Sequence, residues 1–164
     1  MLPAVAALVV LADQLSKAAV MNSLPEGQSW SIASWLTPIV QFTHVTNTGA
    51  AFGLFPGLGA LFVIVSFIVV VAILLYGRHL PTGRWLTRVA LGLQLGGAIG
   101  NNLIDRLSRG YVVDFIDVQF WPLHNFPVFN LADTSIVVGV AILCLILIWE
   151  DRREQSARCV AETG

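Results

Sequence analysis

Residues 58–76 read LGALFVIVSFIVVVAILLY and contain no charged side chain. A helix that crosses a bilayer needs roughly 20 mostly apolar residues, so this stretch is expected to span a membrane. Three further stretches fit the same description with a few polar interruptions, at residues 2–20, 85–104 and 131–149. We therefore predict an all-α polytopic membrane protein with four transmembrane helices, folded as a single domain over residues 1–164.

The composition agrees with lipid as the solvent for much of the chain. Charged residues make up 12% of it and apolar residues 56%, and the mean hydropathy is +0.77. Soluble domains carry about 25% charged residues, so these charges are too few to cover a surface that faces water. Nine Lys and Arg residues with a net charge of −1 cannot build a basic face, which argues against a nucleic-acid partner.

The distribution of basic residues predicts the orientation in the membrane. Residues 21–57, between the first two spans, contain no Lys or Arg. Cytoplasmic loops are enriched in these residues. Six arginines lie in or beside the 77–84 loop and in the C-terminal tail, against two in the loop after the third span. Both termini are therefore expected in the cytoplasm, and the two long loops outside. The six are Arg78, Arg84, Arg88, Arg152, Arg153 and Arg158.

Ionisable side chains at membrane depth are costly, so each of them is a candidate functional residue. Asp13 and Lys17 are four residues apart on one helical face, and we expect an ion pair that locks the first span against its neighbours. These charges, together with the lack of a basic start, also argue against a cleaved signal peptide. The small residues of 96–100 predict close helix packing.

Two further aspartates flank the second outer loop. Asp114 lies between apolar neighbours, and Asp133 begins the fourth span. Two carboxylates that share one site cannot easily both ionise, so one keeps its proton. The ionised partner can then activate water while the protonated one binds a peptide carbonyl. An alternative for Asp133 is a plain helix N-terminal acid with an exposed side chain. The spacing of the two aspartates alone does not decide between these readings.

Taken together, five segments resemble the lipoprotein signal peptidases, the signal peptidase II family. They occur in the family's order and with comparable spacing across nearly the whole chain. The segments are Asp13-Gln14-Leu15-Ser16-Lys17, Asn47-Thr48-Gly49-Ala50-Ala51-Phe52, Gly97-Ala98-Ile99-Gly100 with Asn102 and Asp105-Arg106, Val113-Asp114-Phe115, and residues 126–133 (FPVFNLAD).

The resemblance implies an aspartic endopeptidase of the bacterial inner or plasma membrane that needs no cofactor or metal. Its partners would be bilayer lipids and diacylglyceryl-modified prolipoproteins, cut just before the lipid-bearing cysteine. It implies a small extracytoplasmic β-structured cradle, which residues 28–55 could supply, and nothing demands more than a monomer. The implied roles are catalysis for Asp114 and Asp133, site support or substrate contact for Asn47, Gly49, Asn102, Arg106, Asn130 and Ala132, and structural polar positions for Asp13, Lys17 and Asp105.

The chain departs from the family pattern at Asn101-Asn102, where the family usually has a single asparagine. We align Asn102 with that position because it is three residues from Asp105, which keeps both on one face. A helix advances about 100° per residue, so the glycines of 96–100 would then be turned relative to Asp105.

Two other classes of function compete with a peptidase. A small proton-coupled transporter would place its polar residues along a path near the membrane midplane, whereas here they gather at the outer ends of the spans. A structural or assembly subunit would tolerate replacement of the aspartates.

Overall fold

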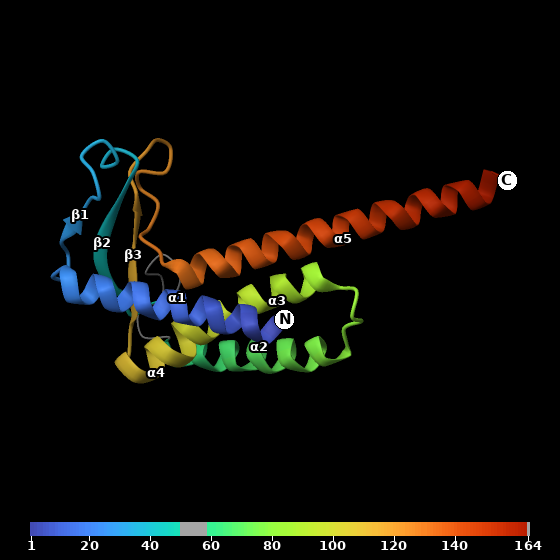
Figure 1. The fold of residues 1–164 in the computed structure, drawn as a ribbon, viewed down its shortest axis with the longest axis horizontal. Coiled ribbons are helices and arrows are strands. Elements are labelled where there is room, and N and C mark those ends of the chain that lie inside the picture. The colour runs from blue at the N-terminus through green and yellow to red at the C-terminus, as the bar shows by residue number, and fades with distance from the viewer. Residues whose placement is uncertain (50–58, 164) are drawn as a thin grey trace.

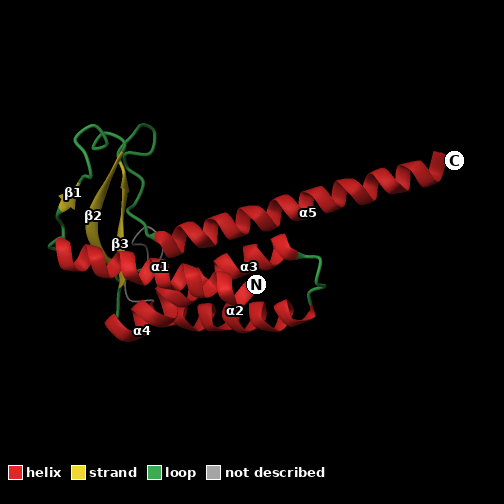
Figure 2. Cartoon of the chain, viewed as in Figure 1, coloured by secondary structure: helices red, strands yellow, loops and turns green. Residues whose placement is uncertain are grey.

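The computed structural model describes residues 1–49 and 59–163, so residues 50–52 of the segment that begins at Asn47 lie outside the described residues. The chain is mostly helical, with a small sheet at one end of the helices (Figures 1 and 2). The helices are α1 (Leu2–Ser23), α2 (Gly59–His79), α3 (Trp85–Ala98), the π-helical segment η2 (Ile99–Asp105), α4 (Arg106–Arg109) and α5 (Leu131–Thr163). The strands are β1 (Ser29–Trp30), β2 (Val40–Asn47) and β3 (Val112–Val118).

Within the described residues, three helices are long and apolar enough to cross a membrane: α1, α2 and α5. Each carries large apolar side chains on its outward face, such as Leu8, Phe67 and Leu145, as expected where lipid is the solvent. The third expected span, residues 85–104, forms as α3 followed by η2, and α3 alone has only 14 residues. Four transmembrane helices therefore remain a prediction. Helices α1, α2 and α5 continue past the C-terminal ends of the expected spans, most of all α5.

Helix α3 lies at the centre and packs against α1, α2 and α5. Glycines allow the close approach to two of these neighbours. A Cβ atom on Gly96 would lie 2.8 Å from the Ala6 carbonyl oxygen of α1, and one on Gly97 would lie 2.5 Å from the Ala132 carbonyl oxygen of α5. The close packing expected from this small-residue run is confirmed, because only glycine, which has no Cβ, lets the helix backbones come so near.

The sheet has the order β1-β2-β3, and all of its strands are antiparallel. The expectation that residues 28–55 supply the β-structure was incomplete, because β3 comes from the second outer loop. The paired residues of β2 and β3 are far apart in the sequence, and no local sequence pattern specifies that these two strands pair. Phe129 then bridges to Ile116 on the free edge of β3. This bridge brings the start of α5 beside the strand that carries Asp114.

Candidate active site

Asp114 lies on β3, opposite Val45 of β2. Its side chain is buried, with 3% of the residue exposed. Two asparagine amides hold the two carboxylate oxygens. Asn47 at the end of β2 donates to Oδ2 at 3.0 Å, and Asn130 donates to Oδ1 at 2.6 Å. Strand pairing and the bridge at Phe129 therefore fix this carboxylate between two loops that are far apart in sequence.

Asp133 lies in the first turn of α5 and forms a reciprocal cap with Asn130. The backbone amide of Asp133 donates to Asn130 Oδ1 at 2.9 Å, and the backbone amide of Asn130 donates to Asp133 Oδ2 at 3.2 Å. This is the capping-box arrangement. The helix-terminal interpretation of Asp133 is thus partly right, but the side chain is half-buried rather than exposed. Its other oxygen, Oδ1, accepts a hydrogen bond from Asn101 at 2.7 Å.

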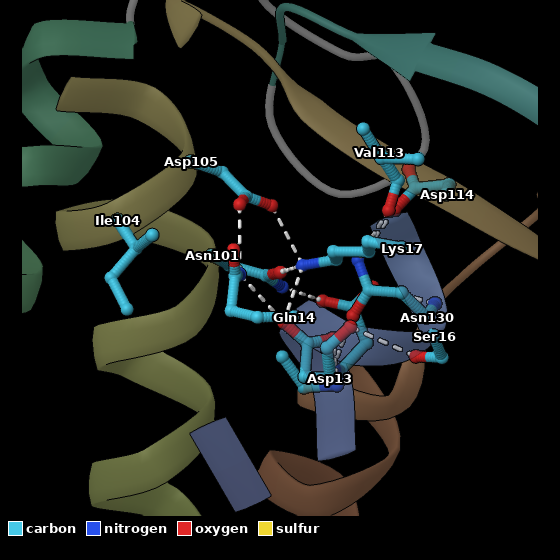
Figure 3. A network of polar contacts seen from close by, with 12 residues as sticks. Asp13, Gln14, Ser16, Lys17, Asn101, Ile104, Asp105, Val113, Asp114 and Asn130 are labelled. Atoms are coloured by element: carbon cyan, nitrogen blue, oxygen red, sulfur yellow. Dashed lines mark hydrogen bonds and ion pairs between the residues drawn. The ribbon is translucent and has the colours of Figure 1, made fainter. Parts of the chain in front are cut away.

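A buried ionic network joins Asp13, Lys17 and Asp105 (Figure 3). Asp13, Lys17 and Asp105 are all 0% exposed. The Lys17 ammonium contacts Asp13 Oδ2 at 2.7 Å and Asp105 Oδ2 at 2.7 Å, and it donates to Asn101 Oδ1 at 2.6 Å. Gln14 donates to both Asp13 and Asp105. The ion pair expected from the spacing of Asp13 and Lys17 is therefore present, and it ties α1 to η2.

The same network reaches the N-terminus of α5 through Ala132. The backbone amide of Ala132 donates to Asp13 Oδ1 at 3.0 Å. The first amides of a helix have no partner within the helix, and a carboxylate there also interacts favourably with the helix dipole. Ala132 is completely buried. It therefore has a packing and backbone role beside Asp133, with no polar side chain to offer a substrate.

Arg106 begins α4 and reaches across to the loop that follows β2. Its Nε donates to Asn102 Oδ1 at 3.0 Å, and its other nitrogens donate to the backbone carbonyls of Thr48 and Gly49. Its guanidinium also lies over the Phe62 ring of α2, 5.5 Å from the centroid. Arg106 also lines the cavity described next.

Both aspartates line one cavity of about 580 Å³, a volume typical of ligand sites. Its polar lining comes from Asn47, Asn101, Asn102, Arg106, Asp114, Asp133 and Thr134. Most of the remaining lining is apolar, from Phe62 of α2, Val112 of β3, residues 126–129 and the first turns of α5. The cavity thus combines a pair of carboxylates with a wall that suits an apolar ligand.

The environment of Asp114 favours its protonated form. Burial, and then the nearby charge of Asp133, raise the pKa of Asp114 to about 7, because both disfavour a second negative charge in the cavity. Burial also disfavours the charged form of Arg106 and therefore lowers the pKa of its guanidinium, whereas the negative charge of Asp114 acts to raise that pKa. One neutral acid beside one carboxylate at neutral pH is the combination that acid–base hydrolysis needs. Within the described range no group of three His, Cys, Asp or Glu side chains could hold a metal ion.

Sequence reasoning missed three members of this site. Asn101, which the alignment left without a role, contacts both Lys17 and Asp133. Gln14 was quoted only as part of a motif. Arg109 forms an ion pair with Asp105, and its i, i+4 spacing is a signal that could have identified it.

Residues 5–149 match the family model described as Signal peptidase (SPase) II. The chain belongs to the signal peptidase II family. It is similar to the lipoprotein signal peptidase of Moorella thermoacetica, with 48% identity over 84% of this chain and 87% of that protein. It is also similar to that of Halothermothrix orenii, with 40% identity over 89% of this chain and 93% of that protein.

Solved structures support the same assignment. One bacterial membrane enzyme matches with a TM-score of 0.80 and 30% identity, over 90% of this chain and 87% of that one. A second matches with a TM-score of 0.75 and 32% identity, over 87% and 89%. As a signal peptidase II, the chain is a membrane protease whose helices are apolar enough for insertion.

Proposed function

We propose that the chain is an aspartic endopeptidase that removes the signal peptides of diacylglyceryl-modified prolipoproteins, cutting before the lipid-bearing cysteine. Its curated relatives are lipoprotein signal peptidases, which supports the substrate class. The observation that carries the aspartic mechanism is that Asp114 and Asp133 line one cavity and are both held by Asn130.

In the proposed reaction, the ionised aspartate takes a proton from a water molecule as the water oxygen attacks the scissile carbonyl carbon. The protonated aspartate donates a hydrogen bond to the carbonyl oxygen as it becomes negative. The carbon–nitrogen bond then breaks and the leaving amine receives a proton from the pair. The raised pKa of Asp114 supports the presence of one proton on the pair near neutral pH, and the proton belongs to the pair because the two groups titrate together.

The remaining site residues have supporting roles in this proposal. Asn47 and Asn130 orient Asp114, whereas Asn102 and Gly49 hold Arg106 at the cavity. We propose that Arg106, which lines the cavity, binds the substrate backbone near the cut. The buried ion pairs of Lys17 with Asp13 and Asp105 hold α1 and η2 together.

We further propose four membrane spans, with both termini in the cytoplasm and the cavity facing the exterior. The sheet and the cavity lie at the opposite end of the helices from the 80–84 turn and the C-terminus (Figure 1), and the positive-inside rule puts the latter in the cytoplasm. The apolar wall at residues 126–129 and α5 suits a substrate that enters sideways from the lipid. A single domain and a monomer suffice, because one chain supplies both carboxylates.

The test is cleavage of a synthetic lipidated signal peptide by the purified protein in detergent, where no gradient can drive a transporter. Asp114→Asn and Asp133→Asn should each abolish cleavage and leave the protein folded. Asp117→Asn is the matched control, because Asp117 lies on the same strand but binds Gln41 and Thr43 instead of lining the cavity. Full activity in either cavity variant would refute the dyad, and equal losses in all three would mean that the substitutions act through the sheet.

A further inference from the structure

The segment η2 contains a π-helical turn. The backbone amide of Arg106 donates to the carbonyl of Asn101, five residues earlier. Such turns usually occur singly inside α-helices and are common at functional sites. In an α-helix, residues five apart point about 140° from one another. The wider turn instead directs both Gly100 and Asp105 towards α1, since a Cβ on Gly100 would lie 2.9 Å from Asp13 Oδ2 and Asp105 contacts Lys17. The turn thus accommodates the additional asparagine without turning the glycine face away from Asp105.

The two adjacent asparagines contact different partners. Asn101 is buried, with 5% exposed, and lies between Lys17 and Asp133. Asn102 is half-buried and contacts Arg106. The two asparagines thus contact different polar groups that line the cavity, Asp133 for Asn101 and Arg106 for Asn102.

The orientation of the Asn101 amide is fixed by its neighbours. An ammonium group can only donate hydrogen bonds and an ionised carboxylate can only accept them. The Asn101 oxygen must therefore face Lys17, and its amino group must face Asp133. The opposite orientation would place two donors together on one side and two acceptors together on the other.

We propose that Asn101 is a positioning residue for Asp133, held in place by Lys17, and that Asn102 positions Arg106 instead. This inference rests on the proposed aspartic mechanism. Asp133 Oδ2 is held by the backbone of Asn130, so the bond from Asn101 to Oδ1 is the second point that stops the carboxylate from rotating. Without it the attacking water and the carboxylate lose their alignment, whereas Lys17 keeps its contacts to Asp13 and Asp105.

The experiment compares Asn101→Leu with the matched variant Asn102→Leu, because leucine has a similar branched shape and no hydrogen-bonding group. For Asn101→Leu we expect kcat to fall about 10- to 100-fold, the size of effect that small misplacements cause, with KM nearly unchanged. For Asn102→Leu we expect the larger change in KM, since Arg106 loses a partner. Both are measured with a lipidated peptide, beside melting curves of each protein in detergent.

A second variant guards against misfolding. Asn101→Asp keeps acceptors for Lys17 and, when ionised beside that ammonium, has no donor for Asp133, so the folded variant should still lose kcat. Parental kcat in either folded Asn101 variant, or equal kcat losses at both asparagines, would overturn the inference. Asp133→Asn separates this result from the larger proposal: if it is inactive while Asn101→Leu is fully active, only the positioning role fails, and if it is active, the dyad itself fails.

Discussion

Replacing Lys17 with methionine should destabilise the protein strongly. The Lys17 ammonium contacts Asp13, Asp105 and Asn101 within 2.7 Å, and both carboxylates are 0% exposed. Methionine fills similar space but leaves buried negative charge without its cation. Removal of one partner from a buried ion pair costs about 3–5 kcal/mol. At roughly 2–4 °C per kcal/mol for a chain of this size, the melting temperature should fall by roughly 6–20 °C.

The assay is thermal unfolding in detergent, followed by tryptophan fluorescence. Arg84→Met is the control, because its ion pair with Glu150 is partly exposed to solvent and surface pairs contribute little. The double variant Lys17→Met/Asp13→Asn should recover part of the loss, since Asp105 still has Arg109 and no carboxylate is then left without a partner. Melting of Lys17→Met within about 2 °C of the parent, or a double variant less stable than the single one, would refute this reasoning.

Three further results are expected. Gly97→Ala should cost about 1–3 kcal/mol of stability, because its Cβ would lie 2.5 Å from a carbonyl oxygen of α5, whereas Gly83→Ala meets nothing within 4 Å and should be neutral in the same melting assay. Asn130→Ala should lower kcat by about 100-fold, measured by peptide cleavage, because the Asp114 carboxylate loses its donor to Oδ1 and the backbone amide of Asp133 loses its acceptor. Native Asp114 keeps its proton to about pH 7, against 3.8 ordinarily. The folded state therefore binds the extra proton and loses stability as pH rises from about 4 to 7. Across that pH interval, melting curves should show the stability of Asp114→Asn rising relative to that of the parent. A difference in stability that stays constant with pH would contradict the raised pKa of Asp114.

Part of the site could be predicted because its signals are local. The i, i+4 spacing of Asp13 and Lys17 implies contact on any α-helix, and the ion pair is present. The run FPVFNLAD places an asparagine three residues before an aspartate at a helix start, and these two residues form the reciprocal cap. Such features depend only on helix geometry, so tertiary packing could not change them.

Other parts could not be predicted because they depend on contacts between distant segments. The third strand pairs with β2 across more than sixty residues, and the Phe129 bridge adds the start of α5 to that strand. The contacts of Asn101 with Lys17 and Asp133 could not be predicted, because the alignment assumed regular helical rotation and the π-helical turn interrupts it. A π turn replaces hydrogen bonds between residues four apart with hydrogen bonds between residues five apart. Here the turn lies beside the close contact of Gly100 with Asp13 and the ion pair of Asp105 with Lys17.

By itself, the sequence determined that the chain belongs in a membrane, because an uncharged stretch such as 58–76 has no stable place in water. It also supplied the two acidic residues. Only the tertiary structure decided that Asp114 and Asp133 line one cavity, and which asparagine holds each of them. The physical reason is that hydrophobicity and helical spacing act along the chain, whereas the environment of a carboxylate is set by burial and by partners from other segments.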